Sequence, residues 1–215
     1  METPIADLHV DSDLRSELLL SGNFTTMEKG VDEAEHSGEM QYPYIAKAIS
    51  DARMRAAGFD CRVLPVMVGN LDAASERHFG SILAPYVARH NVFTVISSDF
   101  CHWGRRFGYT PSSSVGSGHH NDISDYIEWL DRSGMSHIES QRPGAFSDYL
   151  RQYSNTICGR HPIGVWLNAI TTNSKSGIER LDVRFIQYAQ SGRVKTLDES
   201  SVSYASAVAR QMTSS

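Results

Sequence analysis

Three residues of this sequence are the leading candidates for a site that moves protons or binds metals: Asp99, His102 and Cys158. Asp99 and His102 belong to the segment ISSDFCHWG, and Cys158 belongs to the segment NTICGRHP. A carboxylate and an imidazole can act as acid and base, as metal ligands, or as a carboxylate that orients an imidazole. A thiolate is a nucleophile and a ligand for soft metals. These residue types predict a site for proton transfer, metal binding or thiol chemistry.

Each of these segments also has a purely structural interpretation. Asp99 can cap a turn while His102 and Trp103 pack beneath the loop that follows. Cys158 can be a small buried apolar side chain, as most free cysteines are. For the pair Asp99 and His102, the two interpretations carry equal weight.

The neighbours of Cys158 favour the functional interpretation. Gly159 allows a close approach of the backbone, and Arg160 and His161 place positive charge beside the thiol. Positive charge and a helix amino terminus both stabilise a thiolate. We therefore expect Cys158 to be a reactive or metal-binding residue, with Trp103, Arg160 and His161 lining its pocket.

A further cluster lies in the segment EAEHSGEMQYPY, at the predicted start of a helix. Its acidic residues suit the positive end of the helix dipole without any further role. His36 and Glu39 are three positions apart, which would place them on one helical face. They are the remaining candidates for the lining of a pocket.

Complete catalytic motifs are absent from the sequence. It contains no HExxH, no pair of CxxC motifs, no Gly-rich phosphate loop and no GxSxG elbow. A hydrolase in which Cys158, His102 and Asp99 serve as nucleophile, base and orienting acid remains an alternative. No oxyanion motif accompanies the thiol.

The elements that must position these residues follow from hydrophobic patterns. The run VFTVI, residues 92–96, is short and β-branched, which predicts a buried strand that ends just before Asp99. Ligands collect at the carboxyl ends of strands in α/β sheets. Residues 162–170 have almost no polar face, which predicts a buried helix with Pro162 in its first turn, directly after Cys158.

The rest of the chain shows alternating helical and strand patterns, so we expect an α/β fold. Residues 61–69, CRVLPVMVG, predict a further strand, residues 111–122 predict an exposed Ser- and Gly-rich loop, and residues 181–185 and 202–208 predict two half-buried strands. Helical periodicity predicts helices over residues 40–57, 79–87 behind a capping Asp72, 123–130 and 146–153.

Whole-chain properties exclude several classes of protein. The chain has 215 residues and 40% apolar content, so we expect one domain, 1–215. The formal net charge of −5 and scattered basic residues argue against nucleic acid as a partner. There is neither a signal pattern nor an apolar run long enough for membrane insertion, and the three cysteines are odd in number and widely spaced. These features predict a cytoplasmic or nucleocytoplasmic protein with reduced thiols.

Five segments, in order along the chain, resemble the Memo family, named for a mediator of ErbB2-driven cell motility. They are EAEHSGEMQYPY, VISSDFCHWGRRFGY, TICGRHPIGVWLNAI, FIQYAQSG and SSVSYA. The resemblance implies a fold similar to class III extradiol dioxygenases of the LigB type, with a central mixed sheet flanked by helices. It also implies that this chain corresponds to the carboxyl-terminal two-thirds of the family domain and lacks the amino-terminal part.

The resemblance assigns roles to the site residues. The family pocket binds iron or copper through two histidines and one cysteine, and the cysteine motif matches Cys158. Asp99 and His102 match the family's pocket-lining residues. The two histidines lie in segments resembling PHAGY and LGPSHH, which this sequence does not contain. We therefore expect the chain to keep one of the family's three metal ligands. Two explanations account for the missing segments: a sequence whose start was assigned too late, or a genuinely short form of the protein. The first is favoured.

Two functions follow from the resemblance. The first is a metal-associated redox or regulatory protein in signalling and cell motility, without established dioxygenase activity, because the cysteine replaces a carboxylate ligand. The second is a module that binds a phosphotyrosine peptide or a signalling protein, with the phosphate held by Arg105, Arg106 and Arg160.

Overall fold

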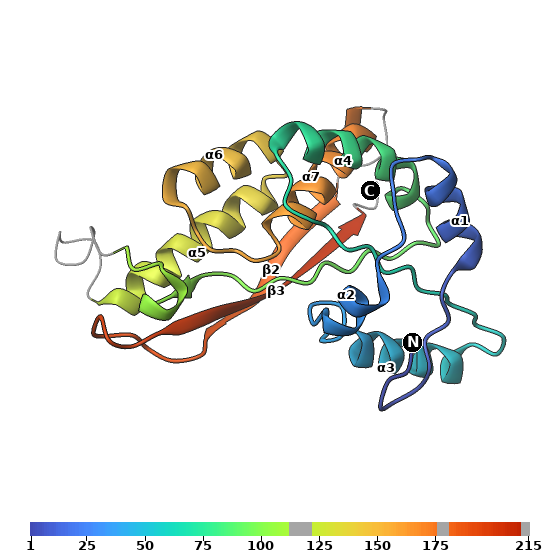
Figure 1. Cartoon of the computed structure of the whole chain (residues 1–215), viewed down its shortest axis with the longest axis horizontal. Helices are drawn as coiled ribbons and strands as arrows, with labels where there is room; N and C mark the ends of the chain where they lie inside the picture. Colours follow the sequence, from blue (N-terminus) through green and yellow to red (C-terminus); the bar gives the residue numbers. More distant parts are fainter. Residues whose placement is uncertain (112–121, 176–180, 212–215) are drawn as a thin grey trace. The chain divides into compact units, whose positions relative to one another are not determined.

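The computed structural model describes residues 1–111, 122–175 and 181–211, which divide into two compact units, Met1–Met67 and Val68–Ser215 (Figure 1). The expected Ser-rich loop at residues 111–122 lies almost wholly outside the described residues. The expectation of a single domain stays a prediction, because compactness does not test whether the units fold independently.

The first unit is helical and has a small core. Its helices are α1 (Ser12–Leu20), α2 (Lys29–Ala34) and α3 (Tyr42–Arg55). Helix α3 confirms the predicted helix at residues 40–57, and its Ala46 and Ile49 pack with Leu8 in the core. Asp11 caps α1 by accepting a hydrogen bond from the backbone of Leu14.

The strand predicted at residues 61–69 does not form. Among the described residues of this segment, only Val63 forms a β-bridge, a single parallel bridge to Val10. Pro65 has no N–H to donate, so the ladder cannot continue through it.

The second unit contains the remaining helices and a three-stranded antiparallel sheet. Its elements are α4 (Ala73–Val87), β1 (His102–Trp103), a short 3₁₀ helix (Arg105–Phe107), α5 (Ile123–Glu139), α6 (Pro143–Tyr153), α7 (Arg160–Lys175), β2 (Leu181–Gln190) and β3 (Ser201–Gln211). The strand order is β1-β3-β2, with His102 opposite Val202 and Tyr188 opposite Ala205.

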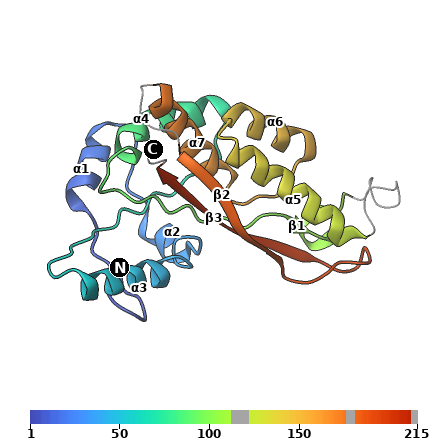
Figure 2. The same cartoon turned by 180° about the vertical axis from the view of Figure 1, so that it is seen from behind.

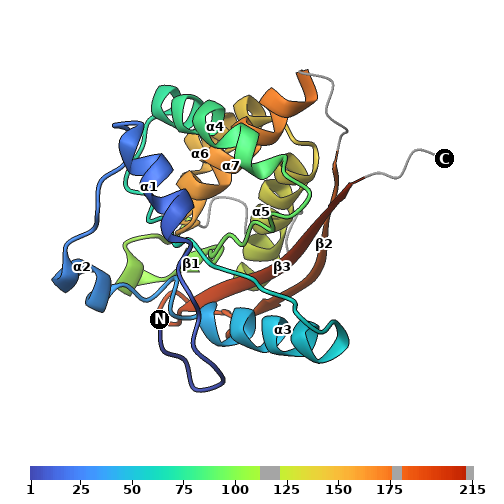
Figure 3. The ribbon, with the colours of Figure 1, turned by 90° about the vertical axis from the view of Figure 1, so that its right-hand side faces the viewer.

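The helices of the second unit form a layer against the sheet. Figures 1 and 3 show α5 beside β2, and α4 alongside α7. Figure 2 shows the hairpin of β2 and β3 from the other side. Helices α4, α5 and α6 confirm the helices predicted at residues 79–87, 123–130 and 146–153, including the Asp72 cap. Helix α7 confirms the helix predicted at residues 162–170 from its apolar character, with Pro162 in its first turn. The α/β class is confirmed, but the described sheet is antiparallel rather than mixed.

The strand predicted at residues 92–96 is wrong. This segment is irregular, and the side chain of Phe93 is 87% exposed. A β-branched run fits a pleated surface, but it becomes a strand only when a neighbouring strand accepts its hydrogen bonds. Among the described residues no strand pairs with it.

A buried carboxylate joins the elements of the second unit. Asp131 of α5 is fully buried and accepts hydrogen bonds from the backbone N–H of Cys101 (3.2 Å), the amide of Asn155 (2.9 Å) and the hydroxyl of Tyr188 (3.0 Å). Burial raises the pKa of Asp131 above its ordinary value, while the hydrogen bonds oppose that shift. The network ties α5 to β2 and to the segments before β1 and α7.

Among the described residues, no helix combines the length and the apolar character needed to span a bilayer.

Replacing Asp131 with alanine should lower the free energy of unfolding by about 3 kcal/mol, because the buried donors of Cys101 and Asn155 and the partly buried hydroxyl of Tyr188 lose their acceptor. Urea unfolding followed by circular dichroism would measure this change. The matched control is Asp148→Ala, because Asp148 lies on an exposed face of α6. A surface change of this kind should alter stability by less than about 0.5 kcal/mol. Equal stability of the Asp131→Ala variant and the wild type would contradict the role of the network.

Candidate functional site

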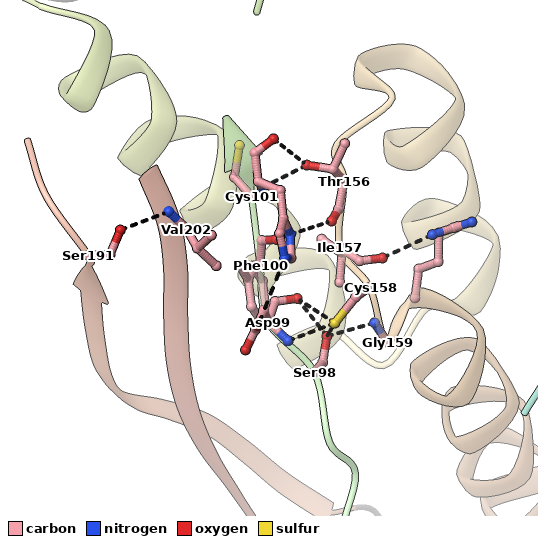
Figure 4. A network of polar contacts seen from close by, with 12 residues as sticks. Ser98, Asp99, Phe100, Cys101, Thr156, Ile157, Cys158, Gly159, Ser191 and Val202 are labelled. Atoms are coloured by element: carbon pink, nitrogen blue, oxygen red, sulfur yellow. Dashed lines mark hydrogen bonds and ion pairs between the residues drawn. The ribbon is translucent and has the colours of Figure 1, made fainter. Parts of the chain in front are cut away.

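The candidate site is built from two irregular segments of the second unit, which Figure 4 shows side by side. Ser98–Cys101 leads into β1, and its Phe100 N–H donates to the carbonyl of Ser203 in β3 (2.8 Å). Residues 156–159 lead into α7. Because Asp131 accepts hydrogen bonds from Cys101 and from Asn155, the same carboxylate holds both segments.

The thiol of Cys158 is exposed and sits on the backbone of the first segment. The N–H of Asp99 donates to Cys158 Sγ at 3.0 Å, and Ser98 Oγ lies 3.8 Å from the sulfur (Figure 4). A backbone N–H directed at sulfur is the kind of donor that a thiolate accepts. Asp99 and Cys158 are 59 positions apart in the chain but lie in contact in the fold, as we expected.

Gly159 makes this contact possible. A Cβ atom at this position would lie 2.6 Å from the carbonyl oxygen of Ser97 and 2.5 Å from Cβ of Ser98. The Gly159 N–H also donates to Ser98 Oγ at 3.0 Å. The glycine thus lets the two segments touch, as the sequence predicts from its position after the cysteine.

His102 is held with a defined ring orientation. Its Nδ1 lies 3.0 Å from the carbonyl oxygen of Phe100 and 3.1 Å from that of Thr156. Because both partners only accept, Nδ1 carries a hydrogen, and in the neutral ring Nε2 keeps its lone pair. Nε2 lies 3.7 Å from Oδ2 of Asp99. The ring can therefore accept a proton or bind an electrophile at Nε2.

The donor atoms suit iron or copper in kind, but they do not complete a metal site. A thiolate and an imidazole anchored through Nδ1 to a carbonyl are typical ligands of these metals. However, no group of three His, Cys, Asp or Glu side chains is placed to hold a metal ion in the described part of the chain. Further ligands would have to come from elsewhere.

Of the residues expected to line the pocket, Trp103, Arg160 and His161 lie in the second unit, in different environments. Trp103 is completely buried, with its Nε1 donating to the carbonyl of Pro111 (3.3 Å), so it is a core residue. Arg160 is half-buried at the start of α7 and borders a cavity with Thr156.

His161 points to a different partner. Its Nδ1 lies 2.8 Å from Oε1 of Glu76 in α4, and its Nε2 is a buried atom with no hydrogen-bond partner among the described residues. Burial raises the pKa of Glu76, and the hydrogen bond from His161 opposes that effect. The pair joins α4 to α7 and provides a structural role for His161.

His36 and Glu39 belong to the first unit. They lie in the turn before α3, so the expectation that they share a helical face is wrong. Glu35 organises this turn instead, accepting hydrogen bonds from the N–H groups of Ser37 and Gly38. The site role of His36 and Glu39 stays a prediction.

Sequence reasoning missed Ser98 and Thr156. Ser98 contacts the sulfur of Cys158, and Thr156 Oγ1 accepts the backbone N–H of His102 at 2.7 Å. The only available signal was their position in the same two segments as Asp99 and Cys158. Because their partners are distant in the chain, spacing alone does not reveal the contacts.

Comparison with known proteins decides the family. A family model described as Memo-like protein matches residues 1–208. The chain belongs to the Memo family. Protein MEMO1 of Xenopus laevis is 46% identical over 203 residues, and protein MEMO1 of Homo sapiens is 45% identical over the same length. In both cases the match covers 94% of this chain and 65% of the relative.

A more distant Memo relative extends the comparison. The memo-1 homolog of Caenorhabditis elegans is 41% identical over 208 residues, which cover 96% of this chain and 56% of that protein. The chain therefore spans less than two-thirds of the length of each of these curated relatives. Any activity or partner of a full-length Memo protein is therefore only proposed for this chain.

The neutral ring of His102 should carry its hydrogen on Nδ1, because two carbonyl oxygens face that atom. Long-range ¹H–¹⁵N correlation spectra of the histidine rings would identify the tautomer. The exposed His90 serves as the internal reference, and assignment is made with a His102→Gln variant. A hydrogen on Nε2 would contradict this geometry.

Gly159→Ala should destabilise the fold by about 2 kcal/mol, because overpacking strains the surrounding structure. The new methyl group would meet backbone, which a side-chain rotation cannot relieve. Denaturant unfolding would measure the loss.

The control is Gly144→Ala in α6, since nothing lies within 4 Å of a Cβ there. Alanine in place of glycine should favour the helix by up to ~1 kcal/mol. If both variants were equally stable, the close packing of the two segments would be wrong.

Proposed function

We propose that this chain is a Memo-like regulatory protein whose reactive centre is the thiol of Cys158. The observation that supports this proposal is the exposed sulfur held at 3.0 Å by the N–H of Asp99. The other two cysteines are less suited. Cys101 is buried, and desolvation raises its pKa, while Cys61 is only partly exposed.

Cys158 is also the proposed donor to iron or copper, together with ligands that the described residues do not supply. His102 presents Nε2 on the neighbouring segment, with the carboxylate of Asp99 at 3.7 Å from that atom. Iron or copper bound to a thiolate supplies one-electron redox chemistry. The residues of this chain hold the sulfur and orient the imidazole.

The broader setting is likewise proposed from family membership. The complete family domain would have a fold similar to class III extradiol dioxygenases, to which this chain contributes the helical layer and the β2–β3 hairpin. Its role would lie in signalling and cell motility, in the cytoplasm or nucleus. Dioxygenase activity is not part of the proposal.

The alternative functions receive less support from the geometry. For a Cys-His hydrolase, His102 should contact the thiol, but no hydrogen bond joins its ring to Cys158 within the described segments. For a phosphotyrosine module, the arginines should converge. Instead, Arg105 pairs with Asp198 at 3.2 Å and Arg106 lies over the ring of Phe107.

Metal affinity tests the proposal directly. The purified chain would be titrated anaerobically with Cu(I) or Fe(II) in competition with a coloured chelator. We expect weak binding by the wild type and at least about a tenfold loss for Cys158→Ser, because a hydroxyl is a poor ligand for soft metals.

Cys61→Ser is the matched control and should leave the affinity unchanged. No measurable binding by the wild type, or equal affinity for the wild type and Cys158→Ser, would refute the assignment of Cys158 as the metal donor. Circular dichroism of each variant would establish that the fold is retained.

A further inference from the structure

The run VFTVI, residues 92–96, is a β-forming segment that leaves its backbone unpaired. It connects α4 to the candidate site as irregular chain (Figure 1). Three of its apolar side chains are exposed, by 37% at Val92, 87% at Phe93 and 43% at Val95. No N–H or C=O group of residues 93–96 forms a backbone hydrogen bond within the described chain. Exposed β-branched residues beside open backbone groups are typical of an edge that pairs with a further strand.

The side chains of this segment divide between two faces. Ile96 is half-buried and packs against the core of the second unit. Because successive side chains of a strand point to opposite faces, Phe93 and Val95 share the face that is turned away from Ile96. A strand added beside the segment must therefore place apolar side chains opposite Phe93 and Val95.

The charges that flank the run select its occupant. No Asp, Glu, Lys or Arg lies between Arg89 on one side and Asp99 on the other. Arg89 is exposed, and the side chain of Asp99 is 43% exposed. Antiparallel pairing with a second copy brings the basic end of each run to the acidic end of the other, whereas parallel pairing brings like charges together. Such charge pairs fix the orientation and the register of an interface.

The segment is thus complementary to itself. We propose that two copies of this chain associate through residues 92–96, paired antiparallel with Thr94 opposite Thr94. Phe93 of each copy then lies opposite Val95 of the other, an aromatic and β-branched pair that stabilises antiparallel strands. The same register aligns Arg89 with Asp99, because both are equally distant from Thr94 in the sequence. The two-fold axis closes the assembly at two copies.

Sedimentation velocity of the whole chain over a range of concentrations, under reducing conditions, tests the association. We expect a weak dimer, with a dissociation constant on the order of 10–100 µM, because a short strand pair lies at the low end of interface sizes. A wild-type chain that stays monomeric up to millimolar concentration, or that forms species larger than a dimer, would overturn the proposal.

Two double variants test which side chains face each other. Phe93→Lys with Val95→Lys places like charges opposite one another and should weaken the dimer at least about tenfold. Phe93→Lys with Val95→Glu places opposite charges at the same positions and should restore most of the affinity. Circular dichroism would establish that both variants are folded. Equal dimer affinity of the two double variants would contradict the pairing of Phe93 with Val95.

Cysteine cross-linking tests the register in a background of Cys61→Ser and Cys158→Ser, which removes the two thiols that are not buried. Thr94→Cys places two thiols on the two-fold axis, where opposed Cα atoms lie about 4.5–5.5 Å apart, within reach of a disulfide. Phe93→Cys is the control. Its two Cα atoms would lie about 8 Å apart in this register, although the position is highly exposed.

On mild oxidation at equal protein concentration, Thr94→Cys should form the cross-linked dimer at least about fivefold faster than Phe93→Cys, because Cα atoms more than about 7 Å apart cannot be bridged without backbone movement. An equal or faster rate for Phe93→Cys would overturn the register. Because Cys158 is replaced in this background, the outcome does not depend on metal binding by its thiol.

Discussion

The buried carboxylate of Asp131 is the constraint on which the rest of the second unit depends. Removing a carboxylate from water is costly unless its oxygens receive hydrogen bonds, so its donors must all come together in the folded state. Those donors belong to Cys101, Asn155, Tyr188 and Ser203. The first two lie in or beside the segments that hold Cys158, which means that the core network also positions the candidate site.

The helices of the second unit could be predicted because the information that specifies them is local. An apolar stripe at helical spacing, an Asp72 cap and a proline in the first turn each act within a few residues. The hairpin strands were predicted for the same reason, from alternation along β2 and β3. The segments at residues 61–69 and 92–96 look similarly β-like, but whether they pair depends on distant parts of the chain.

The candidate site could be predicted only in part. The residue types and the flanking glycine pointed to Cys158, and the family resemblance linked it to Asp99 and His102. The contacts that fix the thiol are made by the backbone of Asp99 and by Ser98, which no spacing rule reveals. Asn155 was missed because its role arises from the buried carboxylate of Asp131, which is distant in the chain. Thr156 contacts His102 and also borders a cavity with Arg160.

The central claim is that the architecture makes Cys158 the reactive thiol of this chain. Timed alkylation of the native protein, with mass spectrometry of the peptides that contain Cys61, Cys101 and Cys158, tests this claim most directly. The account predicts that Cys158 is modified first and that Cys101 reacts only after unfolding, because Cys101 is buried and its pKa is raised. Faster modification of Cys61 than of Cys158 in the folded chain would contradict it.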